Sequence, residues 1–220
     1  MNTVDDMIYS ATTKKRPMIG LTLLVVEDSR FACEALRLMS LRSGARLRRA
    51  DCLASARRHL KTYRPNVMIV DVGLPDGSGL DLIRDIKNSF DFAPILLATS
   101  GDDFLYEPAL KAGAHGFIAK PLASISEFQS MILRHFPGRP VLIDSQAIDE
   151  VIVPDSIAYR DDLCHALELL EDGMSPYLNK FIYGIGTCAA DAELLQCLKS
   201  LDIQNLKSVI STKINAIHPL

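Results

Sequence analysis

The sequence predicts an α/β fold in which a doubly wound, five-stranded parallel sheet is followed by a small all-α domain. In roughly the first 135 residues, short apolar runs alternate with longer amphipathic stretches. Apolar runs without polar alternation are typical of strands buried on both faces, and the helices between them supply the crossovers that parallel strands need. Beyond about residue 155, the remaining segments all have helical patterns.

The elements follow from these patterns in chain order. Strands are expected at 21–26, 45–50, 67–72, 94–99 and 116–119. Helices are expected at about 30–42, 52–62, 79–88, 103–112 and 124–135. The last helix is supported by Phe128, Ile132 and His135, because residues at i, i+4 and i+7 share one helical face.

Four segments can be separated by composition. Residues 1–18 are polar and end in a basic run, so we expect a flexible N-terminal arm. Residues 19–137 contain the predicted sheet, and the proline-containing residues 138–155 are expected to be a linker. Residues 156–220 are expected to form a helical output or interaction domain.

Capping residues mark the first helices of this second domain. Asp155 or Ser156 is expected to begin a helix that runs to about Asp172. Ser175 followed by Pro176 is typical of a helix start, because proline is well tolerated at the first helical position. Two further helices are expected at about 190–200 and 204–217.

Composition limits the cellular setting. The five cysteines are widely spaced and form no C-x-x-C pair, which argues against a disulfide framework or a zinc ribbon. We find no signal-peptide pattern and no apolar run near the roughly 20 residues of a spanning helix. We therefore expect a cytoplasmic protein that does not insert into a membrane.

Polar residues follow four of the five predicted strands. In open parallel sheets, ligands bind beyond the carboxyl ends of the strands, so these residues are expected to converge on one edge. They are Glu27, Asp28, Asp71, Thr99, Ser100 and Lys120.

Three carboxylates in one place repel each other unless a cation lies between them, and hard oxygen ligands favour Mg²⁺ over zinc. A carboxylate beside such a metal, with a lysine and a hydroxyl nearby, is equipped to attack phosphorus in line. Alone, Asp71 before a Gly/Pro loop is typical of a turn, and Lys120 of an ordinary surface lysine. The combination favours phosphoryl transfer to Asp71.

Residues 20–136 resemble a response-regulator receiver domain of two-component signalling, which has a flavodoxin-like fold. The matching stretches are VVEDS, D-x-x-LPD-x-x-G, ATS and GAHGFIAKP, in the expected order. The resemblance implies that Asp71 is the phosphoacceptor, while Glu27 and Asp28 are the acidic pair that holds Mg²⁺. It also implies a metal ligand in the Gly73 carbonyl.

The same resemblance assigns the residues that respond to phosphorylation. Lys120, with Thr99 and Ser100, would bind the phosphoryl group. Thr99 would be the switch hydroxyl and Phe117 the switch aromatic. Two departures are small: Glu27 stands where the family more often has Asp, and Phe117 lacks a phenol, so we expect it to favour an inward rotamer.

The resemblance implies a phosphoprotein of a phosphorelay that accepts its phosphoryl group from a sensor histidine kinase or a phosphotransfer protein. We expect no enzymatic activity beyond Mg²⁺-dependent self-phosphorylation and dephosphorylation. The face formed by the fourth helix, fifth strand and fifth helix is expected to bind a protein partner or a second copy of the chain.

The output of the second domain stays open between three hypotheses. A helical bundle that docks a protein partner or dimerises is the default. Segments 165–175 and 201–217 faintly resemble a LuxR-type helix-turn-helix, but residues 141–220 carry 5 basic against 12 acidic residues, which disfavours DNA. A phosphotransfer role for His165 is the third hypothesis, although the usual lysine and glycine neighbours are missing.

Overall fold

The computed structural model describes residues 16–89, 94–122, 124–139, 152, 154–200 and 202–217. Its first domain is a five-stranded sheet with the strand order β2-β1-β3-β6-β7, and every neighbouring pair is parallel. The strands are β1 (Thr22–Val26), β2 (Arg46–Ala50), β3 (Val67–Asp71), β6 (Ile95–Ser100) and β7 (Gly116–Ala119). The predicted fold class is therefore confirmed.

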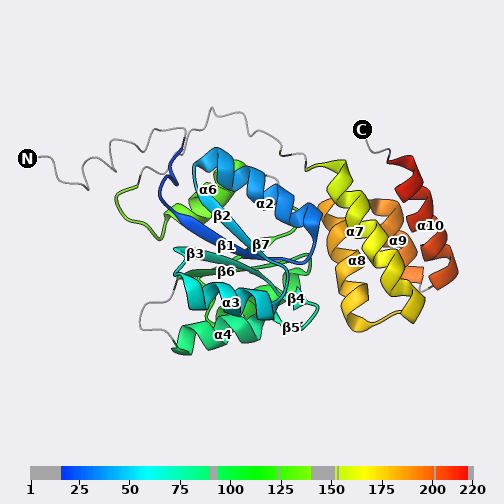
Figure 1. Ribbon diagram of the computed structural model, residues 1–220, viewed down its shortest axis with the longest axis horizontal. Coiled ribbons are helices and arrows are strands. Elements are labelled where there is room, and N and C mark those ends of the chain that lie inside the picture. The colour runs from blue at the N-terminus through cyan, green and yellow to red at the C-terminus, as the bar shows by residue number, and fades with distance from the viewer. Residues whose placement is uncertain are drawn as a thin grey trace, which may run out of the picture.

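Helices cover both faces of the sheet (Figure 1). One face packs against α2 (Arg30–Ser43) and α6 (Ile125–Leu133). The other packs against α3 (Leu53–Thr62), α4 (Gly79–Ser89) and α5 (Tyr106–Ala112). All five residues of β3 are buried, because the central strand has a helix layer on each side.

Within the first domain, the element boundaries agree closely with the sequence, with two differences. A two-stranded ribbon, β4 (Gly73–Leu74) and β5 (Gly77–Ser78), lies in the loop after β3 and was not predicted. The predicted helix at 103–112 begins instead as a 3₁₀ turn, η1 (Asp103–Leu105), whose N-cap is Asp102. The Asp102 carboxylate accepts a hydrogen bond from the Phe104 N–H, as expected for a capping residue.

The predicted N-terminal arm lies outside the described residues up to residue 15. At the end of this predicted arm the structure differs from the prediction. The apolar side chain of Met18 is fully buried in the core beneath α2 and α6. The Met18 N–H also donates to the Ser43 carbonyl. Most of the predicted linker, 138–155, is likewise outside the described residues, although Ile152 is buried in the same core.

The second domain is a bundle of α7 (Ser156–Leu169), a 3₁₀ turn η2 (Leu170–Asp172), α8 (Pro176–Cys188), α9 (Ala192–Ser200) and α10 (Ile203–Ala216). The predicted caps are confirmed: Asp155 accepts from the Ile157 N–H, and Ser175 from the Leu178 N–H. Within the described ranges, we find no helix that is both long and apolar enough to span a membrane.

The bundle sits against one end of the sheet domain (Figure 1). Helices α7 and α8 pack on α2, and α8 also contacts β4. This end of the sheet carries the carboxyl ends of the strands, because α2 follows β1 and the β4–β5 ribbon follows β3. The second domain therefore lies beside the predicted phosphorylation site.

Phe128→Ala should destabilise the protein strongly, because Phe128 is fully buried between α6 and the sheet. Truncating a buried phenylalanine typically costs about 3–5 kcal/mol, part of which is the cavity left behind. Urea unfolding followed by circular dichroism measures the change. Phe104→Ala is the matched control, because Phe104 is 91% exposed; equal losses for the two variants would contradict the proposed packing.

Candidate functional site

The candidate site lies at the carboxyl edge of the sheet, where three neighbouring strands end. Glu27 and Asp28 directly follow β1, and Asp71 is the last residue of β3. Asp71 is paired in register with Thr99 on β6. The parallel register therefore brings residues that are far apart in sequence to one edge of the sheet.

The three carboxylates form one cluster. One oxygen from each of Glu27, Asp28 and Asp71 lies within 4.8 Å of the others. Lys120 Nζ lies 2.8 Å from Asp71 Oδ1 and 2.8 Å from Glu27 Oε2. The contact with Glu27 is an ion pair without the geometry of a hydrogen bond. The sequence prediction that these four side chains meet is thus matched by their positions.

Burial dominates the electrostatics of the cluster. It raises the pKa of Glu27 to about 8, against the opposing effect of Lys120. It also raises the pKa of Asp28 to about 6, helped by the charge of Asp71. Burial alone would lower the pKa of Lys120, but Asp71 and Glu27 hold it well above its ordinary value.

The charge balance of the cluster favours a divalent cation. Three carboxylates face one ammonium, so ionising all three leaves negative charge that the described side chains around them do not neutralise. Oxygen ligands of this kind suit Mg²⁺. The donor set of the cluster therefore fits a Mg²⁺ ion.

The loop after β3 is held by hydrogen bonds at both ends. The Gly73 N–H donates to Asp71 Oδ2 at 2.7 Å, while the Asp76 carboxylate accepts from the first two N–H groups of α3. An added Cβ at Gly79 would lie 1.9 Å from the Asp71 carbonyl, so only glycine fits there. A metal-ligand role for the Gly73 carbonyl stays a prediction.

The predicted switch residues lie on the neighbouring strands β6 and β7. The Thr99 hydroxyl is buried and donates to the Ile118 carbonyl at 3.0 Å rather than to Asp71. Ser100 lines the cavity above Asp71. Phe117 is half-buried against the core and packs edge-on against Tyr106, with ring centroids 5.9 Å apart.

The sequence did not reveal that the second domain contributes to this site. Asp162 of α7 accepts hydrogen bonds from the Ser29 hydroxyl at 2.7 Å, the Arg30 N–H at 2.9 Å and the Phe31 N–H at 3.0 Å. It thereby binds the N-terminal turn of α2, where free N–H groups and the helix dipole favour an anion. Nothing in the local sequence around residue 162 signals this partner, because α2 begins 132 positions earlier.

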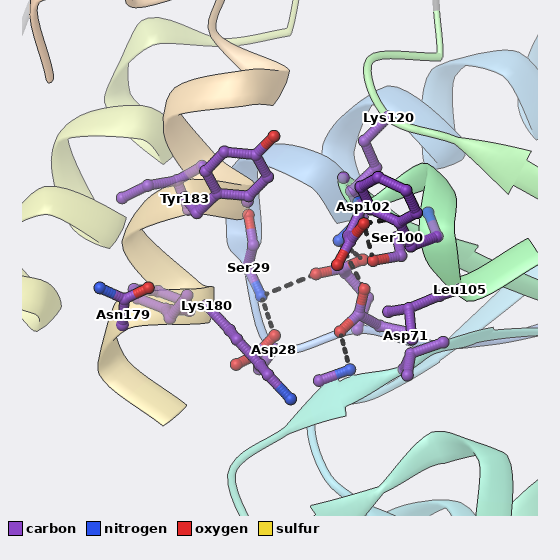
Figure 2. Close-up of a pocket in the computed structure, with 18 residues that line it drawn as sticks. Asp28, Ser29, Asp71, Ser100, Asp102, Leu105, Lys120, Asn179, Lys180 and Tyr183 are labelled. Atoms are coloured by element: carbon purple, nitrogen blue, oxygen red, sulfur yellow. Dashed lines mark hydrogen bonds and ion pairs between the residues drawn. The ribbon is translucent and has the colours of Figure 1, made fainter. Parts of the chain in front are cut away.

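Helix α8 makes the second connection. The Tyr177 hydroxyl donates to Asp28 Oδ2 at 2.7 Å. Tyr183 and Lys180 of the same helix line a cavity of about 460 Å³ together with Asp71 and Lys120 (Figure 2). The candidate phosphorylation site is therefore walled on one side by the second domain.

Comparison with known proteins identifies the family. Residues 23–132 match the response regulator receiver domain, and this range is half of the chain. The chain therefore belongs to the response regulators of two-component signalling through its receiver domain.

Similar proteins include the KDP operon transcriptional regulatory protein KdpE of Escherichia coli, 32% identical over 110 residues that cover 50% of this chain and 48% of KdpE. The virulence transcriptional regulatory protein PhoP of Salmonella typhimurium is 33% identical over 45% of each chain. Response regulator MprA of Mycobacterium ulcerans is 31% identical over 60% of this chain and 57% of MprA. The chain spans about half the length of the curated relatives it matches.

Among solved structures, the receiver domain from Methylobacillus flagellatus has a TM-score of 0.48 and 22% identity, and covers 52% of this chain and 97% of that chain. The receiver domain of sensor histidine kinase PA1611 from Pseudomonas aeruginosa, reported with a coordinated magnesium ion, has a TM-score of 0.48 and 24% identity. It covers 52% of this chain and 96% of that chain.

Asp162→Ala should destabilise the protein by about 1–3 kcal/mol, because it leaves buried donors of α2 without their acceptor. The thermal midpoint and the urea midpoint both measure the loss. Asp161→Ala is the matched control, since Asp161 forms a surface ion pair with Arg30, and such pairs contribute about 0–1 kcal/mol. A loss for Asp161→Ala that equals the loss for Asp162→Ala would contradict the capping role.

Without divalent metal, stability should fall as pH rises from about 4.5 to about 8. The folded protein raises the pKa of Glu27 from 4.5 to about 8, so it binds more protons than the unfolded chain in this window. Thermal midpoints in EDTA across this range measure the slope. Glu27→Gln should reduce the slope of the thermal midpoint against pH, whereas Glu107→Gln, a control at an exposed residue, should leave it unchanged. Equal slopes for wild type and Glu27→Gln would contradict the prediction.

Proposed function

We propose that this response regulator accepts a phosphoryl group on Asp71 from a phosphohistidine of a sensor kinase or phosphotransfer protein. The proposal is supported above all by the position of Asp71, whose carboxylate lies between Lys120 and the Gly73 N–H at the floor of a cavity. Its side chain is 9% exposed, which limits access to groups that enter this cavity.

In the proposed reaction, an oxygen of Asp71 forms a bond to phosphorus as the P–N bond of the phosphohistidine breaks. The electron pair of that bond stays on the histidine nitrogen. Lys120, already 2.8 Å from Asp71, neutralises charge on the transferred group. Glu27, Asp28, Asp71 and the Gly73 carbonyl would hold Mg²⁺, which supplies further positive charge for the phosphoryl oxygens.

The proposed response begins at Thr99. Its hydroxyl would leave the Ile118 carbonyl and donate to a phosphoryl oxygen, with the Ser100 group nearby. Phe117 would then move into the vacated space and alter the α5–β7–α6 face. Phe104, in the turn before α5, and Tyr106, the first residue of α5, are exposed aromatic residues, which supports contact with a protein partner or a second copy here.

We assign the second domain to protein interaction rather than to DNA binding. Two lysines are available on α10, the segment that faintly resembles a recognition helix, and both are engaged. Lys207 pairs with Glu171, and Lys213 pairs with Asp191 and Glu193. A helix whose cations are paired within the bundle is a poor ligand for phosphates.

Asp71→Asn should abolish phosphorylation. Incubation of the wild-type protein with a small phosphodonor and Mg²⁺ should give one acid-stable, base-labile adduct by intact mass, because an acyl phosphate is the expected product. Asp102→Asn is the matched control, since Asp102 lines the same cavity but caps η1. An adduct that persists in Asp71→Asn, or none in wild type, would overturn the mechanism.

The output assignment has its own test. The phosphorylated and unphosphorylated protein should bind genomic DNA fragments equally weakly across a series of salt concentrations, measured by fluorescence anisotropy. Sequence-selective binding with a steep salt dependence would instead establish the helix-turn-helix hypothesis. A Lys207→Gln, Lys213→Gln variant tests whether any binding observed uses α10.

A further inference from the structure

The helical domain contacts the receiver domain at Asp28, one of the carboxylates expected to hold the metal. The Tyr177 hydroxyl of α8 donates to Asp28 Oδ2, and the Ser29 N–H donates to Asp28 Oδ1 at 3.1 Å. Both oxygens of this carboxylate are therefore engaged when the bundle is docked. A cation that uses Asp28 must share or displace these donors.

Lys180 adds a positive charge at the same place. Its side chain extends from α8 past Asp28 toward the start of β4 (Figure 2). Its aliphatic stem lies against Gly73, where an added Cβ would be 3.6 Å from Lys180 Cδ. Among the described ion pairs none includes Lys180, so the ammonium is not neutralised by a carboxylate within 4.0 Å.

The docked bundle therefore offsets part of the negative charge of the three carboxylates. A phenol donates to one carboxylate, and an ammonium lies close to the loop that follows Asp71. A divalent cation at the same carboxylates would lose the first interaction and meet repulsion from the second. Docking of the bundle and binding of a cation both offset the charge of the same carboxylates. Each should therefore weaken the other.

We propose that the helical domain is an intramolecular ligand of the phosphorylation site, and that Tyr177 and Lys180 make its docking compete with Mg²⁺ at Asp28. This inference rests on the proposed function, because it takes Mg²⁺ to be the cation of the site. Linkage requires the effect to be reciprocal: Mg²⁺ favours release of the bundle by the same factor by which docking weakens Mg²⁺ binding.

Release would also change access to Asp71. Helix α8 contributes Asn179, Tyr183 and Ile185 to the wall of the cavity above Asp71. A phosphodonor protein must bring its phosphorus atom into this cavity. The docked bundle occupies one side of the approach, so Mg²⁺ binding and exposure of the phosphoacceptor are coupled through the same contact.

The first experiment measures Mg²⁺ affinity in the full-length chain by isothermal titration calorimetry. Tyr177→Phe should bind Mg²⁺ at least about tenfold more tightly than wild type, the lower end of the factor expected for removing a hydrogen bond to a charged group. Lys180→Met should also bind more tightly, because the charge is lost and the aliphatic stem is kept. Tyr183→Phe is the control: Tyr183 lines the same cavity, and within the described part of the chain its hydroxyl forms no hydrogen bond with the cluster.

The second experiment follows docking through native cysteines. Cys188, at the end of α8, is partly buried and lines a small cavity with Lys120 and Pro121 of the receiver domain, so release of the bundle should expose its thiol further. Mg²⁺ should increase its rate of alkylation by iodoacetamide, measured by peptide mass spectrometry. Cys197 is buried in the core of the bundle itself, and its unchanged rate would exclude unfolding as the cause.

The possible results separate this inference from the proposed function. If wild type and all variants fail to bind Mg²⁺, the proposed function falls and the inference falls with it. If Mg²⁺ binds but Tyr177→Phe and Lys180→Met leave its affinity unchanged or weaken it, the inference alone is overturned. A Cys188 alkylation rate that Mg²⁺ leaves unchanged or reduces likewise overturns it.

Discussion

The constraint on which the structure depends is an excess of buried negative charge at the end of the central strands. Glu27, Asp28 and Asp71 face one ammonium, that of Lys120. Carboxylates so placed are costly in a low-dielectric environment unless they are protonated, paired or bound to a cation. The raised pKa values of Glu27 and Asp28 are a direct expression of this cost. A site of this kind is poised to bind any group that brings positive charge or hydrogen-bond donors.

The helical domain is one such group. Its hydroxyl and ammonium groups approach the cluster from α8, while Asp162 of α7 binds the N-terminal turn of α2. The two contacts have opposite polarity: the bundle gives an anion to a helix N-terminus and donors to a carboxylate. This complementarity accounts for docking at the carboxyl edge of the sheet, although the bundle is acidic as a whole.

The scaffold gives the site its rigidity. β3 is buried along its whole length, so Asp71 is held by a strand that cannot move without disturbing both helix layers. The loop beyond it is held by Asp76 on α3 and by the close approach of Gly79 to the Asp71 carbonyl. The Thr99 hydroxyl, by contrast, is held among the described residues by one hydrogen bond, to the Ile118 carbonyl. Rigid support beneath Asp71 and a neighbouring hydroxyl with one hydrogen bond are consistent with the proposed response of the site to one added group.

The sequence by itself determined the fold class, the elements to within a few residues, and the residues that meet at the sheet edge. It could do so because apolar runs and helical periodicity are local, and because parallel strands must end at a common edge. It did not show that Met18 is part of the core, or that Asp162, Tyr177 and Lys180 belong to the site. The contacts of Asp162 and Tyr177 depend on how the helical domain packs on the receiver domain, across separations of more than 100 residues. Such packing is set by matching surfaces, which leave no periodic pattern in the chain, and only the tertiary structure decided it.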